Sequence, residues 1–184
     1  MKKKLTTVLA IVLVVALSVA GTYAYLTDKT DAIKNTFTVG NVDIGLKETT
    51  GDSYKMVPGN TISKDPKVTV KANSEDSYVF VKVEKSDNFD SFMTYTIADG
   101  WLPLEDVDGV YYRVYSRTAT DTIFDVLKDN EVTVKSDVTK AMMDGLTEAT
   151  YPTLTFTAYA CQSAGFETAA AAWAELTKAH QMSN

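Results

Sequence analysis

Residues 21–46 read GTYAYLTDKTDAIKNTFTVGNVDIGL, and this stretch joins a predicted export signal to the first predicted strand of a β domain. Upstream lie three lysines at positions 2–4 and then an uncharged apolar run over residues 8–20. Thirteen residues suit the apolar core of a signal peptide, which has roughly 7–15 residues, whereas a membrane-spanning helix needs roughly 20. The sequence therefore predicts export.

The end of the signal is predicted from Thr22-Tyr23-Ala24, which places small residues three positions and one position before a cut. We expect cleavage between Ala24 and Tyr25, so that residues 1–24 are the signal peptide and residues 25–184 are one secreted domain. The alternative is an uncleaved signal anchor, because residues 5–7 and 21–24 extend the apolar run to a marginal span.

A first strand is predicted to follow, with a change of phase inside it. Phe37 and Val39 are apolar at odd positions, whereas the next apolar residues, from Val42 to Leu46, fall at even positions. Because side chains alternate with a period of two along a strand, this change requires one extra residue, and Gly40 is the natural place for a β-bulge.

GTYAYLTD at residues 21–28 and NTFTVGNVDI at residues 35–44 resemble the amino terminus of the TasA/camelysin family. The resemblance continues at PGNT (58–61), at Trp101 and at GVYY (109–112). It implies export through a dedicated signal peptidase of the SipW type. It also implies a β-sandwich fold and kinship with fibre-forming proteins of the bacterial biofilm matrix.

Composition limits the class of protein. Without residues 1–24, 15 basic and 24 acidic residues remain, a net charge of −9 that disfavours nucleic acid and anionic membranes as partners. About 160 residues suit one domain with a sizeable core. The single cysteine, Cys161, excludes an internal disulfide, and its apolar surroundings predict a small buried hydrophobic residue.

Alternation with a period of two predicts most of the strands. Apolar residues alternate with polar ones in five further segments: 68–70, 79–83, 93–97, 132–134 and 151–160. Residues 110–115 are expected to form another strand, and turns are expected at residues 57–60 and 99–100. Seven or eight short strands predict an all-β fold, a jelly-roll-like antiparallel β-sandwich.

Two short helices are also predicted. Ser136 is expected to cap a helix over residues 137–144 that ends at Gly145. Thr168 is expected to cap a C-terminal helix over residues 168–180, which docks its Trp173 face on the sheet. Residues 118–130 fit either a helical turn or an irregular strand.

Catalytic chemistry has little support in the sequence. His180 is the only histidine, no HExxH pair is present, and a catalytic triad would need that same residue. Members similar to camelysin are described as metallopeptidases, but this sequence supplies no zinc ligands. We therefore expect no enzymatic activity and no metal or other cofactor.

Two further motifs have an ordinary structural interpretation. Asp106-Val107-Asp108-Gly109 copies the start of a calcium loop but lacks the later glutamate, so a turn is favoured. The sequence contains ten tyrosines, and two groups of aromatic residues could offer a strip for glycan or protein binding. One group is Tyr78 with Phe80, and the other is Tyr111, Tyr112 and Tyr115. Filling of the sandwich core is the favoured role.

Assembly of several copies of the chain is the remaining function that the sequence suggests. Residues 25–34 are mostly polar and are too weakly apolar to hold a place in their own sheet. Their scattered apolar side chains are Tyr25, Leu26, Ala32 and Ile33. An extended segment of this kind can pair with the open sheet edge of a neighbouring copy. Together with the family resemblance, this makes a secreted fibre subunit on the surface or in the matrix of a Gram-positive bacterium the leading hypothesis.

The expected partners are other copies of the chain in a head-to-tail polymer, the dedicated signal peptidase, and other matrix proteins or polysaccharide. A cell-surface adhesin that uses the tyrosine-rich strands is the alternative. A metallopeptidase similar to camelysin comes third.

Overall fold

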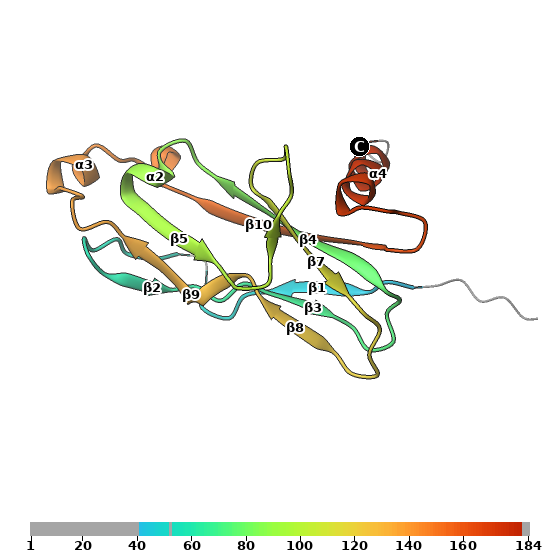
Figure 1. Cartoon of the computed structure of the whole chain (residues 1–184). Helices are drawn as coiled ribbons and strands as arrows, with labels where there is room; N and C mark the ends of the chain where they lie inside the picture. The colour runs from blue at the N-terminus through green and yellow to red at the C-terminus, as the bar shows by residue number, and fades with distance from the viewer. Residues whose placement is uncertain (1–40, 52, 182–184) are drawn as a thin grey trace, which may run out of the picture. The chain divides into compact units, whose positions relative to one another are not determined.

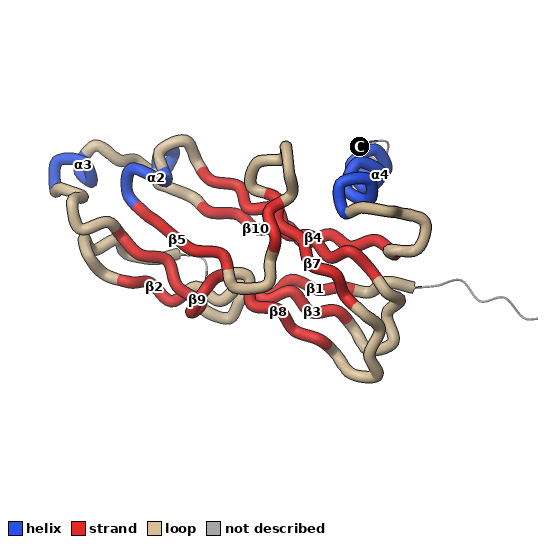
Figure 2. Tube along the Cα trace, viewed as in Figure 1, coloured by secondary structure: helices blue, strands red, loops and turns tan. Residues whose placement is uncertain are grey.

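Every strand pair in the fold is antiparallel, and the strands form two layers with a C-terminal helix outside one of them (Figure 1). The computed structural model describes residues 41–51 and 53–181, which lie in one compact unit, Val39–Asn184. Figure 2 colours this unit by secondary structure, with helices blue, strands red and loops tan.

The elements have the following bounds. The strands are β1 (Ile44–Lys47), β2 (Thr61–Ser63), β3 (Lys67–Val70), β4 (Ser77–Lys85), β5 (Met93–Ile97), β6 (Leu102–Pro103), β7 (Val110–Tyr115), β8 (Thr122–Asp125), β9 (Leu127–Val134) and β10 (Leu154–Gln162). The helices are α2 (Phe89–Phe92), α3 (Lys140–Asp144), the 3-10 helix η1 (Glu148–Thr150) and α4 (Ala169–Gln181).

One layer consists of two short ladders, β1-β3-β8 and β2-β9-β5, that continue into each other. β2 leads into β3, and β8 leads into β9. The segment that contains β2 and β3 therefore pairs with the segment that contains β8 and β9 in both ladders. Between the ladders, the amide of Lys64 donates to the carbonyl of Asn130 (2.7 Å) and that of Val126 to the carbonyl of Pro66 (3.0 Å). The layer is therefore one bent sheet with β1 at one edge and β5 at the other.

The second layer is the four-stranded sheet β10-β4-β7-β6. Its central strand β4 directs Val79, Val81 and Val83 at the first layer, where they pack with Val68 and Val70 of β3. Four of these five valines are fully buried and Val83 is 5% exposed. This packing follows from alternation with a period of two, and it confirms the predicted all-β sandwich.

Helix α4 covers part of the outer face of the second sheet. Thr168 caps the helix as predicted, because its Oγ1 accepts from the amide of Ala171 at 3.2 Å. Trp173 packs on Phe80 and Tyr159 with 5.2 Å between ring centroids in each case. Among the residues that the structure describes, no helix is long and apolar enough to span a membrane.

The prediction for residues 136–145 was wrong about where the helix begins. Thr139, not Ser136, is the N-cap, and its side chain accepts from the amide of Met142, so α3 starts only at Lys140. Val138 is 4% exposed and packs with Phe92 and Val134, which holds the chain before Thr139 outside the helix. Core packing therefore overrode the capping signal.

The segment over residues 118–130, for which the sequence allowed a helical turn or a strand, forms strand. β8 pairs with β3, and β9 begins at Leu127 after the single residue Val126. Val126 and Leu127 are both fully buried, while Ile123 is 61% exposed. The mixed apolar pattern thus reflects a strand that changes from one ladder to the next, where no regular period is kept.

Candidate functional site

The outer edge of β10 is an incompletely covered edge of the sandwich. Three of its core-facing residues are only partly buried, although each of the three lies beside a β4 residue that is almost completely buried. Ala160 pairs with Val79, Ala158 with Val81 and Phe156 with Val83. Since both members of each pair face the same core, the difference arises because β4 has neighbours on both sides whereas β10 pairs only with β4 among the described residues.

Strand β1 shows the same arrangement at the edge of the other layer. Ile44 and Leu46 are partly buried, while their partners on β3, Val70 and Val68, are fully buried. β1 lies near β10, so the two incompletely covered edges occur on the same flank of the sandwich. Apolar side chains from both layers are therefore available there to an added segment.

The hydrogen-bonding directions along β10 follow from the two ends of its ladder. The carbonyl of Thr153 accepts from Ser86, and the amide of Ser163 donates to Asp76. Bonded pairs alternate in an antiparallel ladder, so odd-numbered residues of β10 bond to β4. The backbone amides and carbonyls of the even-numbered residues, including Ala158 and Ala160, point outward along the edge.

The edge of β10 has none of the usual protection against pairing. The strand reads LTFTAYACQ, nine residues without a charge or a proline, and its register with β4 has no bulge. β5, the last strand of the other layer, has a register shift between Tyr95 and Ile97, and β6 ends at Pro103. Bulges and prolines hinder strand addition, so β10 is better suited than β5 or β6 to accept a strand.

The residues predicted to be donated to such an edge lie outside the described part of the chain. These are the cleavage pair Ala24 and Tyr25, the donor residues Tyr25, Leu26, Ala32 and Ile33, and the Gly40 bulge. Their roles stay predictions.

The tyrosines singled out in the sequence do not form one strip. Tyr78 and Tyr112 pack with Phe80 on the face that carries α4, with ring centroids 6.3–6.5 Å apart. Tyr111 and Tyr115 pack against the valine core on the opposite face of the sheet. A strand reverses side-chain direction at every residue, so consecutive tyrosines cannot share a surface.

Cys161 lies next to the tyrosine cluster on the α4 side. It is a free cysteine that is partly buried against the cluster containing Phe80 and Trp173. Burial raises the pKa of its thiol above the ordinary value of 9.0. Cys161 is therefore less buried than predicted, although its surroundings are apolar as expected.

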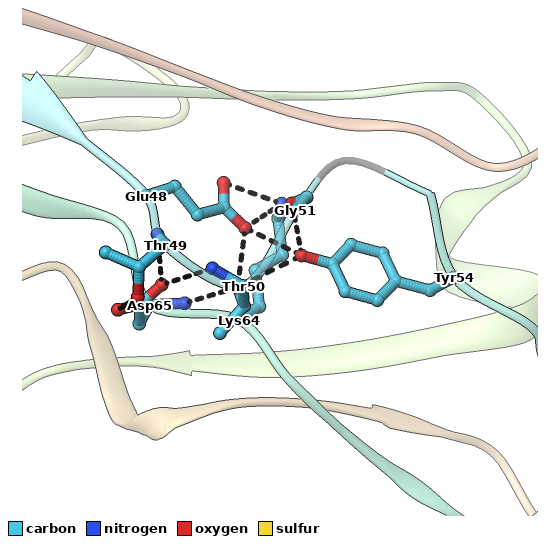
Figure 3. Close-up of polar contacts among 7 residues, drawn as sticks. All are labelled: Glu48, Thr49, Thr50, Gly51, Tyr54, Lys64 and Asp65. Atoms are coloured by element: carbon cyan, nitrogen blue, oxygen red, sulfur yellow. Dashed lines mark hydrogen bonds and ion pairs between the residues drawn. The ribbon is translucent and has the colours of Figure 1, made fainter.

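A network of polar contacts, centred on Asp65, fixes the loop that follows β1 (Figure 3). Asp65 is 8% exposed, and its carboxylate accepts from the Thr49 amide (2.8 Å), the Thr49 hydroxyl (2.7 Å) and the Thr50 amide (3.1 Å). The hydrogen bond from the Thr49 hydroxyl is the largest cause that lowers the pKa of Asp65 to about 2. Asp65 lies 15 or 16 positions after these partners, so no local sequence pattern signals the contact.

The same network reaches the open flank through Lys64. Its ammonium donates to both Glu48 carboxylate oxygens (2.7 and 3.0 Å) and lies 5.3 Å from the ring centroid of Tyr54. It also lies 5.7 Å from the ring of Phe156 on β10. The loop after β1 is thereby connected to the partly buried edge strand, which stabilises one end of that flank.

Replacing Asp65 with Asn is expected to remove the part of the stability that depends on its charge. Because the pKa of folded Asp65 is lower than the ordinary 3.8, its contribution is present above that pH and is lost as the pH falls through about 2. The difference in unfolding midpoint between the wild type and Asp65→Asn should therefore shrink between about pH 5 and pH 2. Denaturant titrations at both pH values measure it.

Asp87→Asn provides the control for this experiment, because Asp87 is an exposed carboxylate. It should leave the unfolding midpoint close to that of the wild type at both pH values. A difference between wild type and Asp65→Asn that is the same at both pH values would contradict the assigned role.

The calcium-loop motif forms a turn, as the sequence favoured. The carbonyl of Gly109 accepts from the amide of Val83 (2.7 Å), and a Cβ on Gly109 would lie 2.5 Å from the Val83 carbonyl oxygen. Gly109 also has a φ of +73°, so glycine is required there by both conformation and space. Within residues 41–51 and 53–181, no group of three or more His, Cys, Asp or Glu is placed to hold a metal ion. The side chain of His180 is outside the described set.

These features define an antiparallel β-sandwich protein with an incompletely covered sheet edge. Residues 1–90 match the family model described as camelysin metallo-endopeptidase. This match confirms, over 90 of the 184 residues, the resemblance to the TasA/camelysin family. Neither a curated protein nor a solved structure matches the chain.

Proposed function

We propose that the chain is a secreted structural subunit of an extracellular biofilm matrix fibre. Residues 25–34 of one copy add as a strand to the outer edge of β10 in the next copy. The observation that supports this proposal most strongly is the incomplete burial of Phe156, Ala158 and Ala160 beside fully or almost fully buried β4 partners. A strand placed along β10 would cover these side chains and pair with their outward backbone groups.

The chemistry of the proposed donor complements that of the acceptor. β10 presents the small side chains of Ala158 and Ala160, whereas the donor segment contains the larger Leu26 and Ile33. Large residues opposite small ones fill space in a sandwich core. The contact joins two different surfaces of the same chain, so its repetition makes an open filament instead of a closed dimer.

The energetic balance of strand addition is close to zero. Each new backbone hydrogen bond contributes roughly 0.5–1.5 kcal/mol, and burial of Leu26 and Ile33 adds about 1.5–3 kcal/mol apiece. Ordering about eight residues costs roughly 1–2 kcal/mol each. Assembly should therefore depend on concentration, with a soluble subunit after secretion and fibres where the protein accumulates.

Purified protein that begins at Tyr25 tests the proposal at rising concentration. We expect fibres in electron micrographs and a pelletable fraction above a threshold concentration. Strand addition joins two copies of the chain, so its extent rises with protein concentration. A protein that stays monodisperse over the whole range would contradict the proposal.

A metallopeptidase activity is the second candidate, because the matching family is described as metallo-endopeptidases. We place it second because the sequence has a single histidine and the described residues offer no metal-ligand cluster. Bound zinc together with casein cleavage that a chelator abolishes would favour the peptidase. Loss of that cleavage in His180→Ala would assign it to this chain.

A further inference from the structure

A cavity of about 430 Å³ lies beside β5, at the edge of its layer opposite β1. Its wall includes Tyr95 and Ile97 of β5, Tyr111 of β7, and an ion pair between Lys85 and Asp90. The threonines at positions 94 and 96 complete the wall. The volume falls within the range of about 300–1,000 Å³ that small-molecule sites occupy.

The cavity is a poor place for an added strand. β5 has only five residues, and its register with β9 shifts between Tyr95 and Ile97. A bulge of this kind bends the strand and breaks the regular spacing of backbone donors and acceptors. The wall therefore favours a compact ligand over an extended peptide.

The charges in the wall are already neutralised. The Lys85 ammonium lies 2.6 Å from the Asp90 carboxylate, so a strong donor and a strong acceptor stand side by side at the rim. Their exposed side chains can still bond to a ligand, because Lys85 is 36% and Asp90 68% exposed. An anionic ligand would have to compete with Asp90 for the Lys85 ammonium. Two adjacent hydroxyl groups of a neutral ligand, by contrast, can accept from Lys85 and donate to Asp90 at the same time.

Two tyrosine rings and Ile97 provide the apolar part of the wall. Tyr95 is held by edge-to-face packing on Phe89, with ring centroids 5.9 Å apart at 68°. Burial raises its pKa to about 12, so its hydroxyl keeps its proton over the physiological range. Within residues 41–51 and 53–181, neither Tyr95 nor Tyr111 has a hydrogen-bonded hydroxyl, which leaves both available to a ligand.

We propose that this cavity binds one or two units of a neutral carbohydrate. Sugars combine apolar C–H faces, which stack on tyrosine, with neighbouring hydroxyls, which bond to paired donors and acceptors. The cavity supplies both in one wall, in Tyr95 with Tyr111 and in Lys85 with Asp90. The cavity and the proposed accepting edge are different surfaces, because β5 and β10 are edges of different layers.

Saturation-transfer NMR with maltose, cellobiose and N,N′-diacetylchitobiose as neutral probes tests the proposal on the full mature chain. We expect at least one probe to bind with a Kd of about 1–10 mM, as suits a small ligand in a shallow site. Lys85→Gln should weaken that binding by about tenfold, since it removes the charged donor. Tyr111→Phe keeps the ring and should weaken it less.

Lys82→Gln is the matched control. Lys82 lies on the same strand, is 37% exposed and forms a 2.6 Å ion pair with Glu84 outside the cavity. It should leave the affinity within about twofold of the wild type. The proposal is overturned if no neutral probe binds at about 10 mM, or if both lysine variants weaken binding equally. A response to extended peptides but not to sugars would likewise overturn it.

Discussion

Deletion of residues 25–34 is expected to yield a folded monomer that forms no fibres at concentrations where the intact mature chain polymerises. The described sandwich forms its core from residues after position 43, so its stability should survive the deletion. The donor contributes both the backbone pairing and the apolar side chains to the proposed contact, so its loss removes the whole interface. Electron microscopy and sedimentation measure the fibres, and far-UV circular dichroism measures the fold.

A length-matched variant separates sequence from chain length in this experiment. Replacing Leu26 and Ile33 with Ser keeps all ten residues but removes about 1.5–3 kcal/mol of burial for each side chain, enough to prevent assembly at the wild-type threshold. Lys29→Ser is the control, because Lys29 is a charged residue of the same segment and has no assigned apolar role. Undiminished fibres from the deleted chain would reject donation by this segment.

Ala158→Pro is expected to block assembly while the monomer stays folded. Even-numbered residues of β10 direct their amides away from β4, so a proline at 158 removes an outward donor and leaves the ladder with β4 intact. An edge strand tolerates proline at such a position, but an incoming strand meets a missing donor and a ring. The threshold concentration should rise at least about tenfold, which corresponds to about 1.4 kcal/mol.

Thr157→Pro is the matched comparison one residue away. The amide of Thr157 faces Lys82 of β4, so this proline breaks the sandwich's own ladder and should lower the unfolding midpoint of the monomer. If Ala158→Pro destabilises the monomer as strongly as Thr157→Pro does, the assigned hydrogen-bond directions are wrong. If Ala158→Pro assembles like the wild type, β10 is not the accepting edge.

Much of the fold could be predicted because its strands follow strict alternation. The valines of β4 and the alternating residues of β10 face the core as their sequence positions require. The C-terminal helix was found from Thr168 and the position of Trp173, since both signals are local. The start of α3 was missed because Val138 is held by the core, which a capping pattern does not report.

The candidate site depends on information that the sequence does not hold locally. That β10 is an edge strand follows from the order of strands in the sheet, and its own sequence shows only the absence of charge and proline. Asp65 and Thr49 meet only because β1 pairs with β3. The two tyrosines of the β5 cavity likewise come from strands of different sheets, β5 and β7.

Amide hydrogen exchange along β10 tests the central claim most directly, in the monomer and in the fibre. The outward amides of Phe156, Ala158 and Ala160 should exchange readily in the monomer and become protected in the fibre, whereas Thr157 and Tyr159 should be protected in both. Outward amides that are already protected in the monomer, or that stay unprotected in the fibre, would contradict strand addition at this edge.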